Sequence, residues 1–193
     1  MILIRDVALI AESLCLVSGG NQSTMNKQTI DITLTINNVE RNLIVGKEEY
    51  LLDTLRNASY FSVKRGCDTG HCGVCLVLLD GKPILSCKIK SADIDGRTIT
   101  TVEGLSENGN LHPIQRAFVE TGAIQCGFCT PSQVLAAKAL LDGNPNPSET
   151  DIRHALRKVF CRCTGYVRTL EAVMRAAAFF SCQCALYECF CDV

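Results

Sequence analysis

Eight cysteines form two groups whose spacing suits metal ligation. The first group reads Cys67-x4-Cys72-x2-Cys75-x11-Cys87. Three thiolates on one short loop with a distant fourth are the spacing of plant-type [2Fe–2S] ligands. Zinc sites more often pair Cys-x2-Cys units at matched ends, so the pattern favours a cluster over zinc or free thiols. The interleaved glycines, which allow positive φ and close backbone approach, are Gly66, Gly70 and Gly73.

The second group reads Cys126-x2-Cys129-x31-Cys161-x-Cys163, and its spacing alone is ambiguous. A four-thiolate zinc site and an iron–sulfur cluster fit it equally well. Both pairs lie at turns before predicted helices, so the four sulfurs are expected to converge at one end of a small bundle. Helix N-terminal dipoles there favour an anionic cluster.

The remaining sulfur and imidazole groups have plainer interpretations. A third cysteine group near the C-terminus has the ligand count for zinc, but an exposed terminus or a segment that docks on a partner is the favoured reading. Its members are Cys182, Cys184, Cys189 and Cys191. Cys15 is expected to be an inert thiol. His71 lies inside the first loop and is expected to be a surface residue, because a Rieske centre needs two histidines.

The first half of the chain predicts strands. Ile30, Ile32, Leu34 and Ile36 alternate with polar residues, which indicates a half-buried strand from Thr29. Further strands are predicted over 40–45, 74–79, 84–85 and 98–102, with turns at Asn37-Asn38 and Asp80-Gly81. A short helix is predicted over 50–57.

The second half predicts helices only. They are expected over 113–121, 131–141, 149–159 and 167–178. Ser148 and Asp151 form a capping-box pattern before the third of these helices. The expected organisation is an N-terminal extension (1–28), a strand-rich domain (29–103), a linker (104–112), a helical domain (113–178) and a cysteine-rich tail (179–193). His112 is expected to be a linker residue.

Composition restricts the class of protein. The 193 residues carry 19 basic and 20 acidic side chains, a net charge of -1, and 47% are hydrophobic. This balance argues against nucleic-acid binding, and the apolar fraction is that of a globular chain. No apolar run reaches the length of a membrane span, and no signal peptide is recognised. We therefore expect a cytoplasmic protein without nucleic-acid or membrane partners.

Three segments resemble the iron–sulfur component of the molybdenum hydroxylases. They are Gly122-Ala-Ile-Gln-Cys-Gly-Phe-Cys-Thr-Pro131, Asn144-Pro145-Asn146-Pro147 and Cys161-Arg162-Cys163-Thr164-Gly165-Tyr166. The family includes xanthine dehydrogenase, aldehyde oxidase, carbon monoxide dehydrogenase, nicotinate dehydrogenase and 4-hydroxybenzoyl-CoA reductase. The resemblance spans roughly residues 29–177. Ser132 and Gln133 depart from it, since Gly and an apolar residue usually follow the proline.

The resemblance implies an α+β protein, with a β-grasp plant-type ferredoxin domain followed by an all-α four-helix [2Fe–2S]-binding domain. Cys67, Cys72, Cys75 and Cys87 would bind an outer cluster towards the flavin. Cys126, Cys129, Cys161 and Cys163 would bind an inner cluster towards the molybdenum. Gln125 and Cys163 are the positions expected to contact the pterin.

The implied function is electron transfer within a larger oxidoreductase. The chain shows no dinucleotide turn, phosphate loop or zinc-protease motif, so no catalytic residues and no substrate site of its own are predicted. A molybdopterin-binding large subunit and an FAD-binding medium subunit are the expected partners, with electrons moving from molybdenum towards FAD. A reductive complex such as 4-hydroxybenzoyl-CoA reductase and a zinc-stabilised interaction module are the alternatives.

Overall fold

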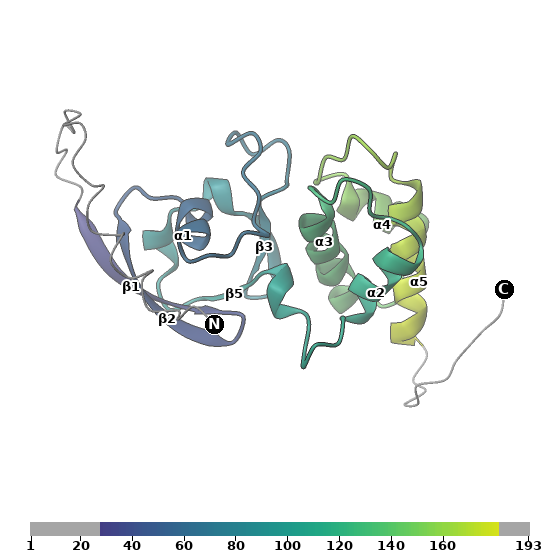
Figure 1. The fold of residues 1–193 in the computed structure, drawn as a ribbon, viewed down its shortest axis with the longest axis horizontal. Helices are drawn as coiled ribbons and strands as arrows, with labels where there is room; N and C mark the ends of the chain where they lie inside the picture. Colours follow the sequence, from purple (N-terminus) through teal and green to yellow (C-terminus); the bar gives the residue numbers. More distant parts are fainter. Residues whose placement is uncertain (1–27, 182–193) are drawn as a thin grey trace, which may run out of the picture.

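The computed structural model describes residues 28–181, which divide into a strand-containing half and a helical half (Figure 1). All five strands lie before residue 101, and the helices α2–α5 follow residue 112. The fold is therefore of the mixed α+β type that the sequence predicts. The residues before 28 and after 181, including Cys15 and the C-terminal cysteine group, lie outside this description.

A five-stranded mixed sheet forms the first half, in the order β2-β1-β5-β3-β4. The bounds of its strands are β1 Thr29–Ile36, β2 Val39–Gly46, β3 Leu76–Leu79, β4 Lys82–Leu85 and β5 Thr98–Thr100. β1 pairs with β5 in parallel, and every other pair is antiparallel. Two tight hairpins connect neighbouring strands. Positive φ at Asn37 and Asn38, and at Asp80 and Gly81, gives both turns the twist that a two-residue hairpin requires.

A first core lies between the sheet and the helix α1, Leu51–Asn57. Alternate residues of β1 point into it, because successive side chains of a strand face opposite sides. It contains Ile32, Leu34, Ile36, Leu51, Leu52, Leu55, Cys75, Val77 and Cys87. The sulfurs of Cys75 and Cys87 therefore lie at the edge of an apolar core, where water is largely excluded.

The four long helices are α2 Pro113–Glu120, α3 Thr130–Gly143, α4 Glu149–Leu156 and α5 Val167–Ser181. The predicted capping box of α4 is confirmed: the Ser148 hydroxyl accepts from the Asp151 N–H, and the Asp151 carboxylate accepts from the Ser148 N–H. α2 is capped by His112, whose Nδ1 accepts from the Ile114 N–H at 3.3 Å. The sequence predicts only a linker residue at this position, because histidine is not among the usual N-cap residues.

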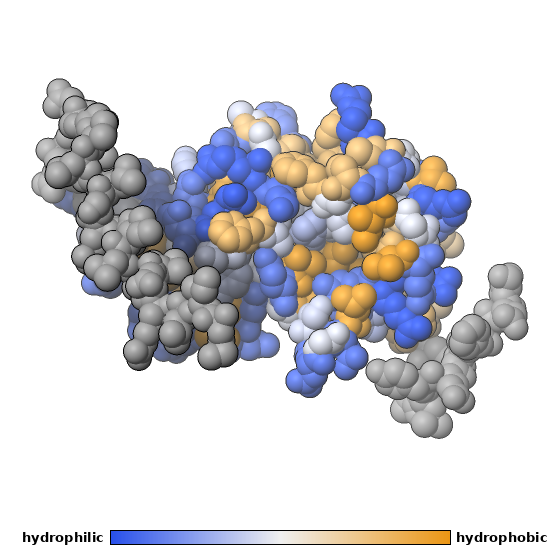
Figure 2. Space-filling view, in the orientation of Figure 1, coloured by the Kyte–Doolittle hydropathy of each residue, from blue (hydrophilic) through white to orange (hydrophobic). Residues whose placement is uncertain are grey.

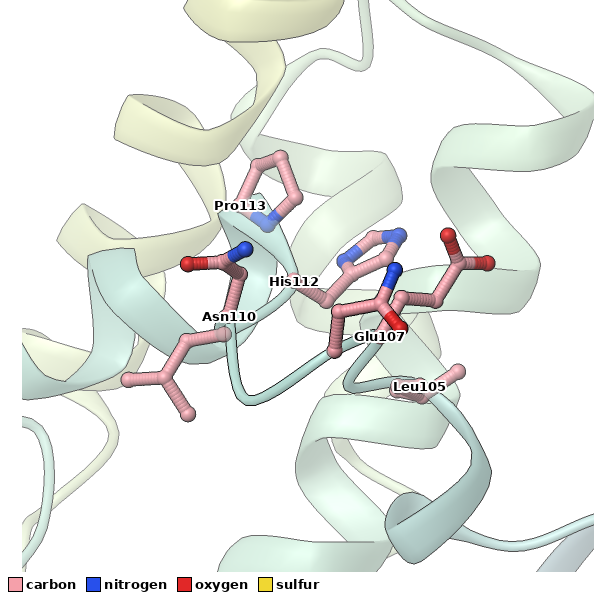
Figure 3. Close-up of a pocket in the computed structure, with 7 residues that line it drawn as sticks. Leu105, Glu107, Asn110, His112 and Pro113 are labelled. Atoms are coloured by element: carbon pink, nitrogen blue, oxygen red, sulfur yellow. The ribbon is translucent and has the colours of Figure 1, made fainter.

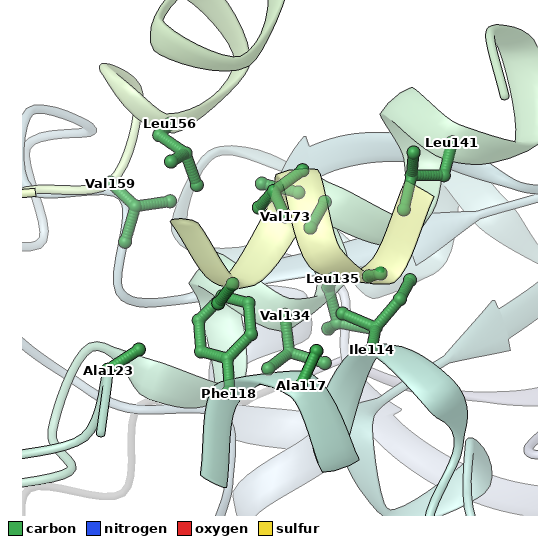
Figure 4. Packing of buried hydrophobic residues seen from close by; sticks show 14 of the residues in the cluster. Ile114, Ala117, Phe118, Ala123, Val134, Leu135, Leu141, Leu156, Val159 and Val173 are labelled. Carbon is green, nitrogen blue, oxygen red and sulfur yellow. The ribbon is translucent and has the colours of Figure 1, made fainter. Parts of the chain in front are cut away.

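The second core joins the helices to one face of the sheet (Figure 4). Phe118, Val134, Leu135 and Val173 meet inside the bundle, and Leu76 and Leu78 of β3 belong to the same cluster. Since Val77 belongs to the first core, β3 is buried on both faces and α3 packs against it. This strand is one of the structural links between the two halves.

Most predicted elements are present, with shifted ends. β3 begins at Leu76 rather than Val74, because the Leu76 N–H is held by the carbonyl of Gly73 in a turn. The last strand ends at Thr100, where the 3₁₀ turn Val102–Gly104 takes over. α4 ends at Leu156 rather than near Val159. Short 3₁₀ turns over Ser86–Lys88 and Ser91–Ile94 were not predicted.

The surface of the helical half mixes apolar and charged side chains on the face seen in Figure 2. Its exposed large apolar residues include Ile124, Phe128, Phe160 and Val167. Within residues 28–181, no helix combines the length and the apolar character that crossing a bilayer requires.

Candidate metal centres

The first quartet consists of Cys67, Cys72, Cys75 and Cys87, all in the strand-containing half. Three of its cysteines occupy the loop before β3, and Cys87 lies in the 3₁₀ turn after β4. Ser86 fixes the two segments to each other, since its hydroxyl donates to the carbonyl of Cys75 at 2.8 Å in the buried interior. The structure thus brings all four sequence-predicted residues to one place.

The sulfurs of the first quartet are arranged as two pairs. The backbone N–H of Cys72 donates to Sγ of Cys67 at 3.3 Å, and the two side chains also interact. Cys87 is paired with Cys75: burial and the neighbouring Cys75 sulfur raise the pKa of the Cys87 thiol to about 11. Two ligands for each of two irons is the requirement of a [2Fe–2S] cluster.

Cys67 is electrostatically different from its partners. Hydrogen bonds from the Thr69 side chain and the Cys72 backbone lower the pKa of its thiol to about 5. Burial raises the pKa of Cys72 instead. Because metal ligands bind as thiolates, this lowered pKa favours the form of Cys67 that can bind a metal.

The loop glycines behave as the sequence predicts at two of three positions. Gly70 and Gly73 have φ of +83° and +70°. Gly66 does not need positive φ, but a Cβ there would lie 2.8 Å from Sγ of Cys72. Glycine is needed at position 66 because a side chain there would collide with the sulfur of Cys72.

The second quartet, Cys126, Cys129, Cys161 and Cys163, lies at one end of the helical half. Cys129 is the N-cap residue of α3, and Cys161 and Cys163 lie in the turn between α4 and α5. Its sulfurs also form two pairs. The sulfurs of Cys126 and Cys163 are 3.6 Å apart, and Cys129 and Cys161 interact through their side chains.

The two pairs of the second quartet differ in exposure. Cys129 and Cys161 are buried, whereas Cys126 and Cys163 are exposed. Burial and the adjacent Cys161 raise the pKa of Cys129 to about 12. Burial also raises the pKa of Cys161, but the hydroxyl and N–H of Thr164 outweigh it, and the pKa of that thiol is lowered. The adjacent Cys126 sulfur raises the pKa of Cys163.

Matches to two domain families cover the two quartets separately. Residues 34–105 match the 2Fe-2S iron-sulfur cluster binding domain, and residues 101–174 match the [2Fe-2S] binding domain. The chain is 43% identical to the nicotinate dehydrogenase small FeS subunit of Eubacterium barkeri, covering 79% of this chain and 96% of that protein. The chain belongs to the iron–sulfur subunits of the molybdenum hydroxylases. It therefore has the electron-transfer role of a subunit of an oxidoreductase complex.

Other relatives of this iron–sulfur subunit show two kinds of architecture. It is 46% identical to the aldehyde oxidoreductase of Megalodesulfovibrio gigas, but it spans only 17% of that longer protein. The solved structure of quinoline 2-oxidoreductase from Pseudomonas putida 86 contains a chain that superposes with a TM-score of 0.77 at 36% identity. The match covers 80% of this chain and 97% of that one.

The donor set of the iron–sulfur subunit suits a two-iron group better than a single ion. The sulfurs occur as pairs within each quartet. Two pairs of thiolates can each serve one iron, whereas zinc requires four donors around one point.

A main-chain hydrogen bond joins the two cysteine loops. Phe160, which precedes Cys161, donates its N–H to the carbonyl of Cys72 at 2.8 Å. A continuous path of covalent bonds and this one hydrogen bond therefore connects a cysteine of the first quartet with one of the second. Tyr166 steadies the same region, because its hydroxyl accepts from the N–H of Cys161 at 2.8 Å.

Three further residues beside the quartets are exposed. His71 is exposed, and its Nδ1 lies 3.0 Å from the Thr69 hydroxyl. Arg65, just before the first loop, forms ion pairs with Asp53 of α1 and with Asp68 of the loop. It thereby ties the loop to the helix. Gln125 is exposed next to Cys126.

A surface hollow of about 320 Å³ lies over the linker and contains none of the eight cysteines (Figure 3). It is lined by Leu105, Glu107, Asn108, Asn110, Leu111, His112 and Pro113.

One further residue contacts the second quartet, although the sequence marks it only as a departure from the family pattern. This is Gln133, a fully buried amide one helical turn after Cys129. The available signal was a polar residue within an otherwise apolar helix face.

Proposed function

We propose that this chain carries two [2Fe–2S] clusters and passes single electrons from a molybdenum centre towards FAD on a partner subunit. The observation that carries the proposal is the two-pair arrangement of sulfurs in both quartets, with a hydrogen bond between their loops. A bound [2Fe–2S] cluster supplies one-electron redox chemistry whose potential depends on exposure and on hydrogen bonds to sulfur.

The ligands are assigned by quartet. Cys67 with Cys72, and Cys75 with Cys87, would each hold one iron of the outer cluster. Cys126 with Cys163, and Cys129 with Cys161, would do the same for the inner cluster. Each set has one better-buried and one better-exposed pair, so every cluster would have a side fixed in the core and a side facing outwards.

The same proposal includes the finer fold assignment. Residues 29–103 form a β-grasp ferredoxin domain, residues 104–112 a linker and residues 113–178 a four-helix cluster-binding domain. In this division residues 1–28 are an extension and residues 179–193 a tail, although α5 itself continues to Ser181. The sheet order, the α1 packing and the succession α2–α5 support this division.

The exposed pair of the second quartet is the proposed contact with the molybdopterin-binding large subunit. Cys163 and Gln125 are exposed and lie at the positions expected to reach the pterin. Ile124 and Phe128, on either side of Cys126, are 39% and 46% exposed. Apolar side chains around a polar contact are typical of the centre of a protein interface. An FAD-binding medium subunit would complete the assembly.

The substrate class follows from the relatives and belongs to the partner. Proteins similar to this chain are named for nicotinate, quinoline and aldehydes. We propose that the complex oxidises a heteroaromatic or aldehyde carbon, with water as the oxygen source. Since no substrate site is assigned to this chain, its residues bind and insulate the electron carriers.

The test is a metal analysis of anaerobically purified protein with EPR after dithionite reduction. About four iron and four sulfide per chain with two distinct signals is the expected result. Cys75→Ser is expected to remove only one signal and Cys129→Ser only the other. Two iron with one zinc would contradict the proposal and make the second quartet a structural zinc site.

A further inference from the structure

Gln133 is a buried amide with an unmet hydrogen-bonding need beside the second quartet. Its side chain has no exposed surface, and its Nε2 lacks a partner in the part of the chain that the structure describes. Its Oε1 accepts from the thiol of Cys129, with the sulfur 3.6 Å away. Buried N–H groups without partners are rare in folded proteins, so this amide requires an explanation.

The explanation lies in the proton of Cys129. A thiol can donate to Oε1, but a metal-bound sulfur has lost that proton and can only accept. Oε1 would then face a negative sulfur. A half-turn about the last side-chain bond exchanges Oε1 and Nε2, which have almost the same shape, and aims an N–H at the sulfur. After this rotation the buried carbonyl oxygen of Gln133 lacks a hydrogen-bond partner, whereas an N–H of the same amide has gained one. Buried carbonyl groups without a partner are less rare in proteins than buried N–H groups without one.

We propose that Gln133 donates an N–H···S hydrogen bond to the Cys129 thiolate and thereby sets the reduction potential of the cluster on the second quartet. The inference rests on the proposed function, since it needs a cluster at that site. A donor aimed at a ligand sulfur stabilises the more negative, reduced state and raises the potential. Gln133 is thus a positioning residue that acts through Cys129.

The surroundings make this hydrogen bond effective. The bond lies in the buried interior, where electrostatic interactions are weakly screened. The exposed sulfurs of Cys126 and Cys163 have no comparable enclosed donor among the described residues. This chain therefore adjusts the reduction potential through the buried sulfurs, whereas solvent or a partner subunit acts on the exposed sulfurs.

The test compares Gln133→Met and Gln133→Leu with the unchanged chain in EPR-monitored redox titrations. Both variants fill a similar volume without a donor, and either one suffices if the other fails to fold. We expect the reduction equilibrium constant of one cluster to fall about three- to tenfold, equivalent to about 28–59 mV more negative for one electron. The other cluster in the same sample is the internal reference and is expected to keep its potential.

Val134→Ala is the matched control. Val134 is the next residue of α3 and packs in the apolar core, so its truncation disturbs the helix without touching a donor. It is expected to leave both potentials unchanged. Two normal signals with unaltered potentials in both Gln133 variants would overturn the inference alone. Absence of the second cluster from the unchanged chain would instead refute the proposed function.

Discussion

The carbonyl oxygen of Lys158 lies 1.8 Å from the point where a Cβ on Gly73 would stand. Gly73 belongs to the first cysteine loop, and Lys158 follows α4 in the helical half. The adjacent residue Cys72 accepts the N–H of Phe160. The absence of a side chain at Gly73 therefore permits a close backbone contact between the two halves.

Gly73→Ala is expected to destabilise this contact. Positive φ costs an alanine about 1–2 kcal/mol, and the steric conflict with the Lys158 carbonyl adds about 1–3 kcal/mol. Gly81→Ala is the control, because Gly81 has φ of +77° but nothing within 4 Å of the added Cβ. Free energies of unfolding from urea titrations measure both. Equal losses in the two variants would show that the Lys158 contact is unimportant.

Thr164→Val is expected to make the potential of the second-quartet cluster more negative. The Thr164 hydroxyl lies 3.1 Å from Sγ of Cys161, and valine keeps the shape but removes that hydrogen bond. Thr164→Ser keeps the hydroxyl and should stay close to the unchanged chain. EPR redox titration separates the two variants. Identical potentials for valine and serine would assign the effect on Cys161 to the backbone N–H of Thr164 alone.

His112 is expected to make stability dependent on pH. Burial, then the nearby Lys138, lowers its pKa, against the opposing pull of the Asp142 and Glu107 carboxylates. Below pH about 6.5 the unfolded chain takes up a proton that the folded His112 resists. The contribution of neutral His112 to the free energy of unfolding is therefore complete above pH about 6.5. It is lost as the pH falls through the lowered pKa that His112 has in the folded state.

His112→Ser tests this origin of the pH dependence. Serine is a good N-cap without a titrating group, so it should support α2 and flatten the stability curve between pH 5 and pH 7. Unfolding free energies at several pH values measure the effect. Parallel curves for the two proteins would place the pH dependence elsewhere.

Exposed apolar residues near Cys126 are expected to support docking of the proposed molybdopterin-binding large subunit. Ile124→Ser combined with Phe128→Ser should weaken association about tenfold or more, since interface anchors contribute upwards of about 1.4 kcal/mol. Ile44→Ser is the control, because Ile44 is 75% exposed on β2 in the other half. Titration calorimetry with the large subunit compares them. Equal affinity in both would exclude this surface from the interface.

The sequence by itself determined the local features of this protein. The alternation of Ile30 to Ile36, the Asp80-Gly81 turn and the Ser148–Asp151 capping box depend on neighbouring residues, and all three are present in the structure. The spacing of the cysteines likewise predicts two ligand sets, because ligand geometry restricts how far apart thiolates on one loop can be.

Tertiary structure alone decided the relationships between distant residues. The pairing of Cys129 with Cys161, the contact of Gly73 with Lys158 and the burial of Gln133 join segments that are far apart in sequence or depend on how helices pack. No local pattern encodes such contacts, since they form only when the sheet and the helices bury β3 between them. The cysteine spacing predicts which residues could serve as ligands, and the packed surroundings decide which sulfurs pair and which of them are buried.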